Sequence, residues 1–136
     1  MHYIYVYMSK NTPTYTGETK NLLERNHQHF TGKNNWQKEC DAIYFAEVKN
    51  QYVAEVYESY LINKYRLILH NSQHPDLWKL HCNLPDKLRS LQWHKVSLSE
   101  INAISTKNGA IDFYVKCLQE KRPYAVSIFD MCHKYD

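Results

Sequence analysis

The first hydrophobic positions of the chain follow the short repeat of a β-hairpin. Residues 3–7 read Tyr-Ile-Tyr-Val-Tyr, and Tyr15-Thr16 resumes this aromatic and β-branched character after a run of turn formers over 9–13. The pattern predicts two antiparallel strands. Gly17 is expected to break the second strand.

A helix is predicted directly after this hairpin, over 21–30. Asn21 with Glu24 three residues later resembles a capping box, which favours a helix start at this point. Arg25 and His29 are four residues apart, so they would stack on the flank of the apolar face of this helix.

A second helix is predicted over 52–66, because apolar residues recur there at the spacing of a core-facing helix. These residues are Val53, Val56, Tyr57, Tyr60 and Leu61. On the helical wheel Glu58 falls about 140° from Val53, whereas Glu55 falls about 200° from it, away from the apolar stripe. Glu58 is therefore expected to be the more sheltered of the two carboxylates.

A third, central strand is predicted over 41–46, a short apolar and aromatic segment between the two helices. The expected fold class is α+β, a small, mostly antiparallel three-stranded sheet flanked by helices, with a helical C-terminal extension. Residues 1–84 would form the core domain and 85–136 the extension. Trp78 and Trp93 are expected to be local anchors outside the sheet.

The extension itself shows two helical patterns. Ser97 and Glu100 resemble a second capping box, which predicts a helix that ends at Gly109. A further apolar stripe precedes Pro123 and predicts one more helix. Its members are Ile111, Tyr114, Val115 and Leu118.

Composition limits the classes to which the chain can belong. With 136 residues, 43% hydrophobic and 23% charged, it has the balance of a compact globular protein. No apolar run approaches the roughly 20 residues that span a bilayer and no signal-peptide pattern is present, so we expect a soluble, intracellular protein. The four cysteines form no Cys-x-x-Cys pair, which argues against a zinc site. A net charge of +3 is compatible with a polyanionic partner but does not require one.

Several of the residues above occur in a known order. Tyr3-Ile4-Tyr5 stands where the GIY-YIG nuclease family has Gly-Ile-Tyr, and Tyr15-Thr16-Gly17 stands at that family's Tyr-Ile-Gly position, with Tyr15 ten residues after Tyr5. Tyr3 replaces the family's first glycine and Thr16 replaces an aliphatic residue. Neither difference removes a reactive group.

The chain thus resembles the GIY-YIG nuclease family, and is most similar to small stand-alone members of the UvrC N-terminal type. The resemblance covers residues 3–71 and implies that the first domain is a nuclease core. It also matches Asn71 to the family's final asparagine, so Gly17 and Asn71 would support the active site. The extension would then contact DNA or form a dimer interface.

The family resemblance implies a role for each of five residues. Glu58 would hold a single divalent cation, Mg²⁺ or Mn²⁺, since a hard ion accepts one carboxylate together with water and phosphate oxygens. Arg25 would bind the scissile phosphate through its planar guanidinium. Tyr5 would contact or activate the attacking water, and Tyr15 would hydrogen-bond the reacting phosphate. His29 would orient this network or relay a proton.

The expected partner is a nucleic acid, in the first place DNA, with RNA left open and no membrane involved. A loop that interleaves cations, amides and an aromatic ring could contact the backbone or stack on an unpaired base. This loop covers residues 32–38, and its candidate contacts are Lys33, Trp36 and Lys38. Lys20, directly before the first predicted helix, is a further candidate.

Three functions remain open from the sequence. The first is a metal-dependent endonuclease that hydrolyses phosphodiester bonds in DNA; since one site cuts one strand, a double-strand cut would require a homodimer or a second binding event. The second is a module that binds DNA or RNA through the same fold and has little activity. The third is a protein-interaction domain in which the motif is coincidental.

Overall fold

The computed structural model describes residues 2–31, 40–65, 77–98, 100, 104 and 106–121. Its strands are β1 (His2–Ser9), β2 (Thr12–Thr19), β3 (Ala42–Val48) and β4 (Trp93–Ser97). Its helices are α1 (Leu22–Thr31), α2 (Gln51–Tyr65), the short 3-10 helix η2 (Leu77–Leu80), α3 (Leu84–Arg89) and α5 (Lys107–Glu120). None of the helices in these described ranges is long and apolar enough to cross a membrane.

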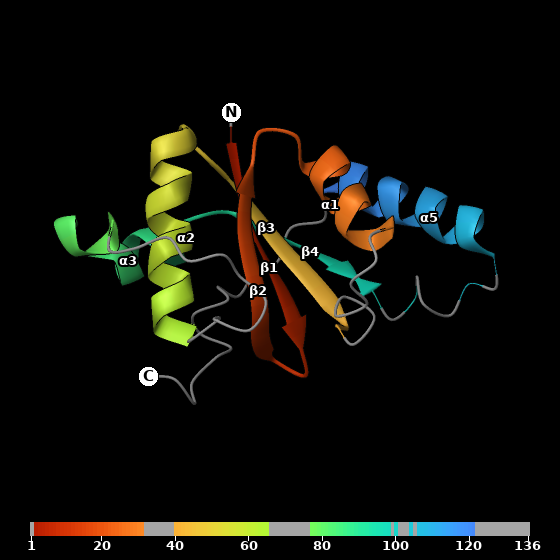
Figure 1. Ribbon diagram of the computed structural model, residues 1–136, viewed down its shortest axis with the longest axis horizontal. Helices are drawn as coiled ribbons and strands as arrows, with labels where there is room; N and C mark the ends of the chain where they lie inside the picture. The colour runs from red at the N-terminus through yellow and green to blue at the C-terminus, as the bar shows by residue number, and fades with distance from the viewer. Residues whose placement is uncertain are drawn as a thin grey trace.

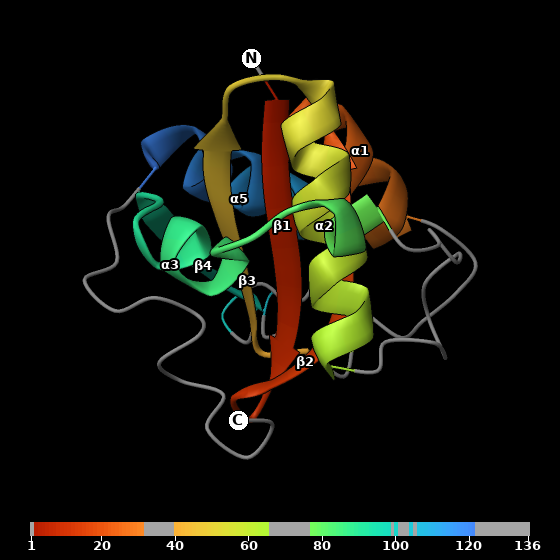
Figure 2. The ribbon, with the colours of Figure 1, turned by 90° about the vertical axis from the view of Figure 1, so that its left-hand side faces the viewer.

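The strands form one four-stranded sheet in the order β2-β1-β3-β4, and every neighbouring pair is antiparallel. Helices α2 and α3 lie on one face of the sheet, and α1 and α5 lie on the other (Figure 1). Figure 2 views the molecule from the α2 side, where this helix runs beside β1. The molecule therefore has a helical layer on each side of its sheet.

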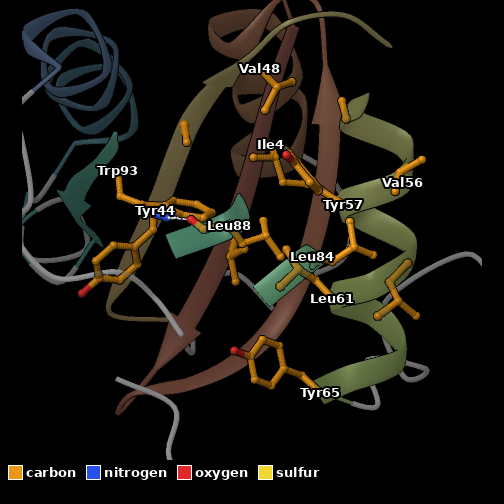
Figure 3. Packing of buried hydrophobic residues seen from close by; sticks show 14 of the residues in the cluster. Ile4, Tyr44, Val48, Val56, Tyr57, Leu61, Tyr65, Leu84, Leu88 and Trp93 are labelled. Carbon is orange, nitrogen blue, oxygen red and sulfur yellow. Dashed lines mark hydrogen bonds between the residues drawn. The ribbon is translucent and has the colours of Figure 1, made fainter. Parts of the chain in front are cut away.

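Two separate cores follow from the alternation of side chains along the strands. Ile4 and Val6 of β1 lie in the core beneath α2, where Leu61 of that helix packs with them (Figure 3). Tyr5 and Tyr7, the alternate residues of the same strand, lie in the core beneath α1 and α5. Because both faces are covered, β1 is an almost continuous run of buried residues.

The β1–β2 hairpin is longer than the sequence predicts. Lys10 and Asn11 alone form its turn, both with positive φ (50° and 63°), as two-residue hairpin turns require. The expectation that Gly17 breaks the second strand is wrong. Gly17 lies inside β2 and pairs with Tyr5.

The prediction of three strands is also wrong, because β4 adds a fourth. Trp93, expected outside the sheet, begins this strand and pairs with Ala46 of β3. Its indole N–H donates a hydrogen bond to the carbonyl oxygen of Leu88 at 3.0 Å. Trp93 is buried in the α2 core and Val96 in the α1 core, so the strand carries no apolar stripe of period two. The segment after residue 84 therefore contributes a strand as well as a helix.

The helix starts are only partly as predicted. The Glu24 N–H donates to Asn21 Oδ1 at 3.1 Å, which confirms Asn21 as the cap of α1. The return bond to the Glu24 carboxylate, at 3.3 Å, comes from the Asn21 side-chain amide, while the Asn21 backbone N–H donates to Thr19 Oγ1. Gly109, in contrast, does not end a helix. It lies in the first turn of α5, where its N–H donates to the cap residue Thr106 at 3.2 Å. The helix predicted before Pro123 is confirmed as α5.

We expect Trp93→Ala to lower the free energy of unfolding by about 3–5 kcal/mol, because it empties a fully buried ring site in the sheet. Trp78→Ala is the matched control. Trp78 is half-buried in η2 beside Tyr60, at 6.2 Å between ring centroids, and its loss should cost clearly less. Urea unfolding followed by circular dichroism measures both changes. Equal losses would contradict the position of Trp93 in the sheet.

Candidate active site

Tyr5 lies in the middle of β1, and Gly17 makes room for its hydroxyl. The Tyr5 side chain is fully buried on the α1 face of the sheet, and its backbone pairs with Gly17 on the edge strand β2. A Cβ built on Gly17 would lie 2.5 Å from Cζ of Tyr5, far inside van der Waals contact. Since φ of Gly17 is not positive, glycine is required here by this close approach and not by its backbone conformation.

Tyr15 lies on the edge strand β2 and adds a second tyrosine ring next to that of Tyr5. It pairs with Tyr7 in the β1–β2 ladder and is only partly buried. Its ring centroid lies 6.2 Å from that of Tyr5, with 29° between the ring planes. The two rings therefore lie next to each other on one face of the sheet, with Tyr5 buried and Tyr15 partly accessible to solvent.

Arg25 approaches both tyrosines from α1. Its guanidinium lies near the Tyr5 and Tyr15 phenols, which raise the pKa of the arginine, and it donates to Gln28 Oε1 at 3.4 Å. Burial raises the pKa of the Tyr5 phenol well above its ordinary value, so Tyr5 stays protonated at neutral pH. The phenol therefore keeps its proton beside the arginine and can act as a hydrogen-bond donor.

Glu58 forms the acidic side of the site. It lies on α2 and is 6% exposed, which confirms that it is more sheltered than the half-buried Glu55. Burial, together with the nearby charges of Glu18 and Glu55, raises the pKa of Glu58 to about 8, against the opposing effect of Arg25. The positive charge of Arg25 thus reaches a carboxylate that belongs to the helix on the opposite face of the sheet.

The edge strand β2 is the element that joins these two halves. It lies between α1 on one side and α2 on the other (Figure 1). Tyr15 and Arg25 are on the α1 side and Glu58 is on the α2 side, and no further strand flanks β2 in the described sheet. The structure therefore brings together four of the five predicted catalytic residues, namely Tyr5, Tyr15, Arg25 and Glu58.

The remaining predicted residues are less fully described. His29 lies in α1, one turn beyond Arg25, but its side chain is outside the described part of the structure. Lys20 is exposed at the end of β2 and lines two surface hollows, one of which it shares with Lys49 and His2. The other predicted residues lie outside the described residues, and they are Lys33, Trp36, Lys38 and Asn71.

Sequence reasoning missed the residues that hold α1 in place. The Tyr7 hydroxyl donates to Asn26 Oδ1 at 2.6 Å, and the Asn26 amide donates to the Leu22 carbonyl at 2.9 Å. The hydroxyl of Tyr114 on α5 lies 3.4 Å from that of Tyr7. Asn26 is fully buried and stands four residues after Leu22, so the helical period could have placed it on the inner face. This network positions the helix that carries Arg25.

Glu18 is a second residue that the sequence analysis missed. It pairs with Ile4, whose side chain belongs to the α2 core, so Glu18 also lies on the α2 face of β2. His2 Nε2 lies 3.7 Å from its carboxylate. The alternation along β2 could have placed Glu18 on this face, opposite to Tyr15 and Gly17.

A divalent cation suits the acidic side of the site. Glu58 can supply a carboxylate oxygen, and the nearby charges of Glu18 and Glu55 would favour a cation at this point. No group of three histidine, cysteine, aspartate or glutamate side chains forms a metal cage within the described ranges. The residues therefore fit an ion that accepts one carboxylate and completes its shell with water and phosphate oxygens, as Mg²⁺ does.

Comparison with known proteins gives one match. A family model described as the GIY-YIG catalytic domain matches residues 1–72. No curated protein and no solved structure matches the chain. The matched segment contains all four residues that converge at the edge of β2, whereas β4 and α5 lie beyond it.

We expect Gly17→Ala to destabilise the protein by about 1–3 kcal/mol, because the added methyl group would overlap the Tyr5 ring. The effect should shrink in a Tyr5→Leu background, where the ring is absent. Urea unfolding of both single variants and of the double variant measures this coupling. An equal cost of Gly17→Ala in both backgrounds would show that the contact with Tyr5 is not the reason for glycine at this position.

Stability should depend on pH through Glu58. Because its folded pKa is raised from 4.5 to about 8, the folded protein holds a proton that the unfolded chain releases in this interval. The free energy of unfolding should therefore fall as pH rises from about 4.5 to about 8. Glu58→Gln should remove this part of the slope, while Asp112→Asn on the exposed face of α5 should keep it. Identical pH profiles for Glu58→Gln and the unmodified protein would contradict the assignment.

Proposed function

The chain belongs to the GIY-YIG family of nucleases. We propose that it is a metal-dependent endonuclease that hydrolyses phosphodiester bonds in DNA. The observation that carries the proposal is the meeting of Arg25, Tyr5 and Tyr15 with the buried carboxylate of Glu58 at the edge of β2. Such hydrolysis requires an attacking water, neutralisation of the charge that develops on phosphorus, and help for the leaving oxygen. The four residues offer groups suited to these tasks.

Arg25 and Tyr15 would bind the scissile phosphate. Arg25 is an exposed residue near both phenols, so its guanidinium is accessible to a phosphate oxygen. Its planar fork can donate two parallel hydrogen bonds to one phosphate. Tyr15, half-buried at the open edge of the sheet, would donate a further hydrogen bond to the same group.

Glu58 would hold Mg²⁺ or Mn²⁺. When bound, such an ion stabilises negative charge on the phosphate and acidifies bound water. The chain contributes the carboxylate of Glu58, which is sheltered from solvent and lies near further negative charge. In these surroundings a carboxylate paired with a bound cation is more stable than an ionised carboxylate without one.

Tyr5 would act as a hydrogen-bond donor and not as a base. The raised pKa of its buried phenol keeps the proton in place, so the O–H can orient the attacking water or a phosphate oxygen. The proton released by that water needs another acceptor. His29, one turn beyond Arg25 on α1, is the residue we assign to this step.

One such site cuts one strand at a time. Nicked plasmid should therefore appear before linear plasmid, and linear product would require two copies of the chain or two successive events. We propose a homodimer only for the double-strand reaction.

The test is cleavage of supercoiled plasmid DNA by purified protein, with Mg²⁺ or with EDTA. We expect nicking that needs the metal and that falls about 10²- to 10³-fold in Arg25→Ala and in Glu58→Gln, the loss typical of a group that stabilises charge in the transition state. Arg89→Ala and Glu120→Gln are matched controls, since both side chains are exposed on other helices. Single-stranded RNA is tested in parallel and should be cut more slowly than DNA.

Two results would contradict the proposal. Undiminished cutting by both active-site variants would remove the catalytic assignment. No cutting by the unmodified protein, together with salt-sensitive binding of nucleic acid, would favour a binding module with the same fold.

A further inference from the structure

One of the two surface hollows lined by Lys20 lies beside the candidate active site, between β1, the start of α1 and the end of α5. Its volume is about 530 Å³, within the range of pockets that bind small ligands. Its apolar walls come from Tyr3, Leu22, Leu23 and Leu118. This hollow is called the α1–α5 pocket below.

The polar groups of the α1–α5 pocket are cationic or uncharged. Lys20 and Lys121 contribute ammonium groups, and Asn21 and Gln119 contribute amides. No carboxylate occurs among the described residues that line it. A ligand that matches these walls has a flat apolar body, a hydrogen-bonding edge and a negative charge. A nucleotide has all three features.

Two elements place the pocket next to the catalytic residues. Tyr3 stands two residues before Tyr5 on the same face of β1, which corresponds to about 7 Å along the strand. Asn21 stands one turn before Arg25 at the start of α1, which corresponds to about 6 Å along the helix axis. A nucleotide in the pocket would therefore adjoin the phosphate bound by Arg25.

Part of the pocket departs from the family pattern or lies beyond the matched segment. Tyr3 occupies the position at which the resemblance expects glycine, and Leu118 and Lys121 lie beyond the matched residues 1–72. The Lys121 Nζ lies 5.7 Å from the centre of the Tyr3 ring and 3.5 Å from its hydroxyl. The Tyr3 hydroxyl also donates to Glu47 Oε1 at 3.3 Å, so Glu47 and Lys121 together hold the ring at the pocket. Lys121 is exposed, and its charge can also attract a phosphate that enters.

We infer that the α1–α5 pocket binds an unpaired nucleobase of the substrate, next to the scissile phosphate, while Lys20 and Lys121 contact the flanking phosphates. The inference rests on the proposed nuclease function and narrows its substrate to DNA that exposes a base beside the cut. A paired base would first have to leave the stack, which costs a few kcal/mol, whereas an unpaired base avoids much of this cost.

The test measures binding of two DNA duplexes to the full chain carrying Glu58→Gln, so that cleavage does not interfere. One duplex carries 2-aminopurine as a single unpaired nucleotide, and the other carries the same base paired. We expect roughly 10-fold tighter binding of the unpaired form and a change in its fluorescence, as base stacking on an aromatic ring predicts. Tyr3→Ala should reduce the preference to less than about 2-fold without weakening binding of the paired duplex.

Matched variants separate the pocket from general effects. Tyr3→Phe keeps the ring and should keep the preference, and Tyr52→Ala removes an exposed tyrosine on α2 and should change nothing. Lys121→Ala should weaken binding of both duplexes, because a phosphate contact is lost, and should also reduce the preference, because the Tyr3 ring loses a contact that holds it. Lys79→Ala, which removes a lysine that lies 5.7 Å over the Trp78 ring, should not.

The outcomes distinguish this inference from the proposed function. If paired and unpaired duplexes bind equally, or if Tyr3→Ala and Lys121→Ala both keep the full preference, the pocket does not bind a base, whether or not the protein cuts DNA. If the preference is present and depends on Tyr3, but the unmodified protein cuts no DNA, the pocket inference holds and the nuclease proposal fails.

Discussion

The structure depends on the register of the β1–β2 hairpin. Pairing of Tyr5 with Gly17 allows a tyrosine ring to cross the neighbouring strand, and it places Tyr15 on the same face and Glu18 on the opposite face. A slip of one residue would exchange the two faces of β2 and separate the phenols from α1. The two-residue turn at Lys10 and Asn11 and the register shift between Tyr7 and Met8 together set this pairing. They determine which side chains lie near Arg25.

At the same edge of the sheet, the burial of an acidic group is electrostatically unfavourable, and the packing of the fold does not account for it. Glu58 is buried near two other carboxylates, and its pKa is raised by burial and by their charges. Local rules of stability are commonly broken where a protein binds or reacts, and a bound cation would relieve this repulsion. On the opposite face, Asn26 and Tyr114 hold Tyr7 and α1 by hydrogen bonds. The hydrogen-bond donors of the α1 face and the acidic group of the α2 face thus adjoin at the edge of β2, and the burial of the acidic group is unfavourable until a cation binds.

Much of the site could be predicted from sequence, and the failures have physical reasons. The sheltered position of Glu58 and the cap at Asn21 depend on residues a few positions apart in the chain, so the sequence predicts both correctly. Gly17 was misread because a glycine that ends a strand and a glycine that admits a neighbouring ring look identical in sequence. The fourth strand was missed because Trp93 and Val96 pack on opposite faces. The contact of Arg25 with both phenols needs the tertiary fold, which aligns two strands and a helix.

The central claim is that groups from both faces of the sheet act as one site at the edge of β2. A double-mutant cycle of Arg25→Ala and Glu58→Gln, measured as single-turnover nicking rates, tests it most directly. If both side chains act on the same phosphate, their effects are coupled, and the double variant should be about as slow as the slower single variant. A double variant slowed by the product of the two single effects would show that the residues act independently, and would contradict the account.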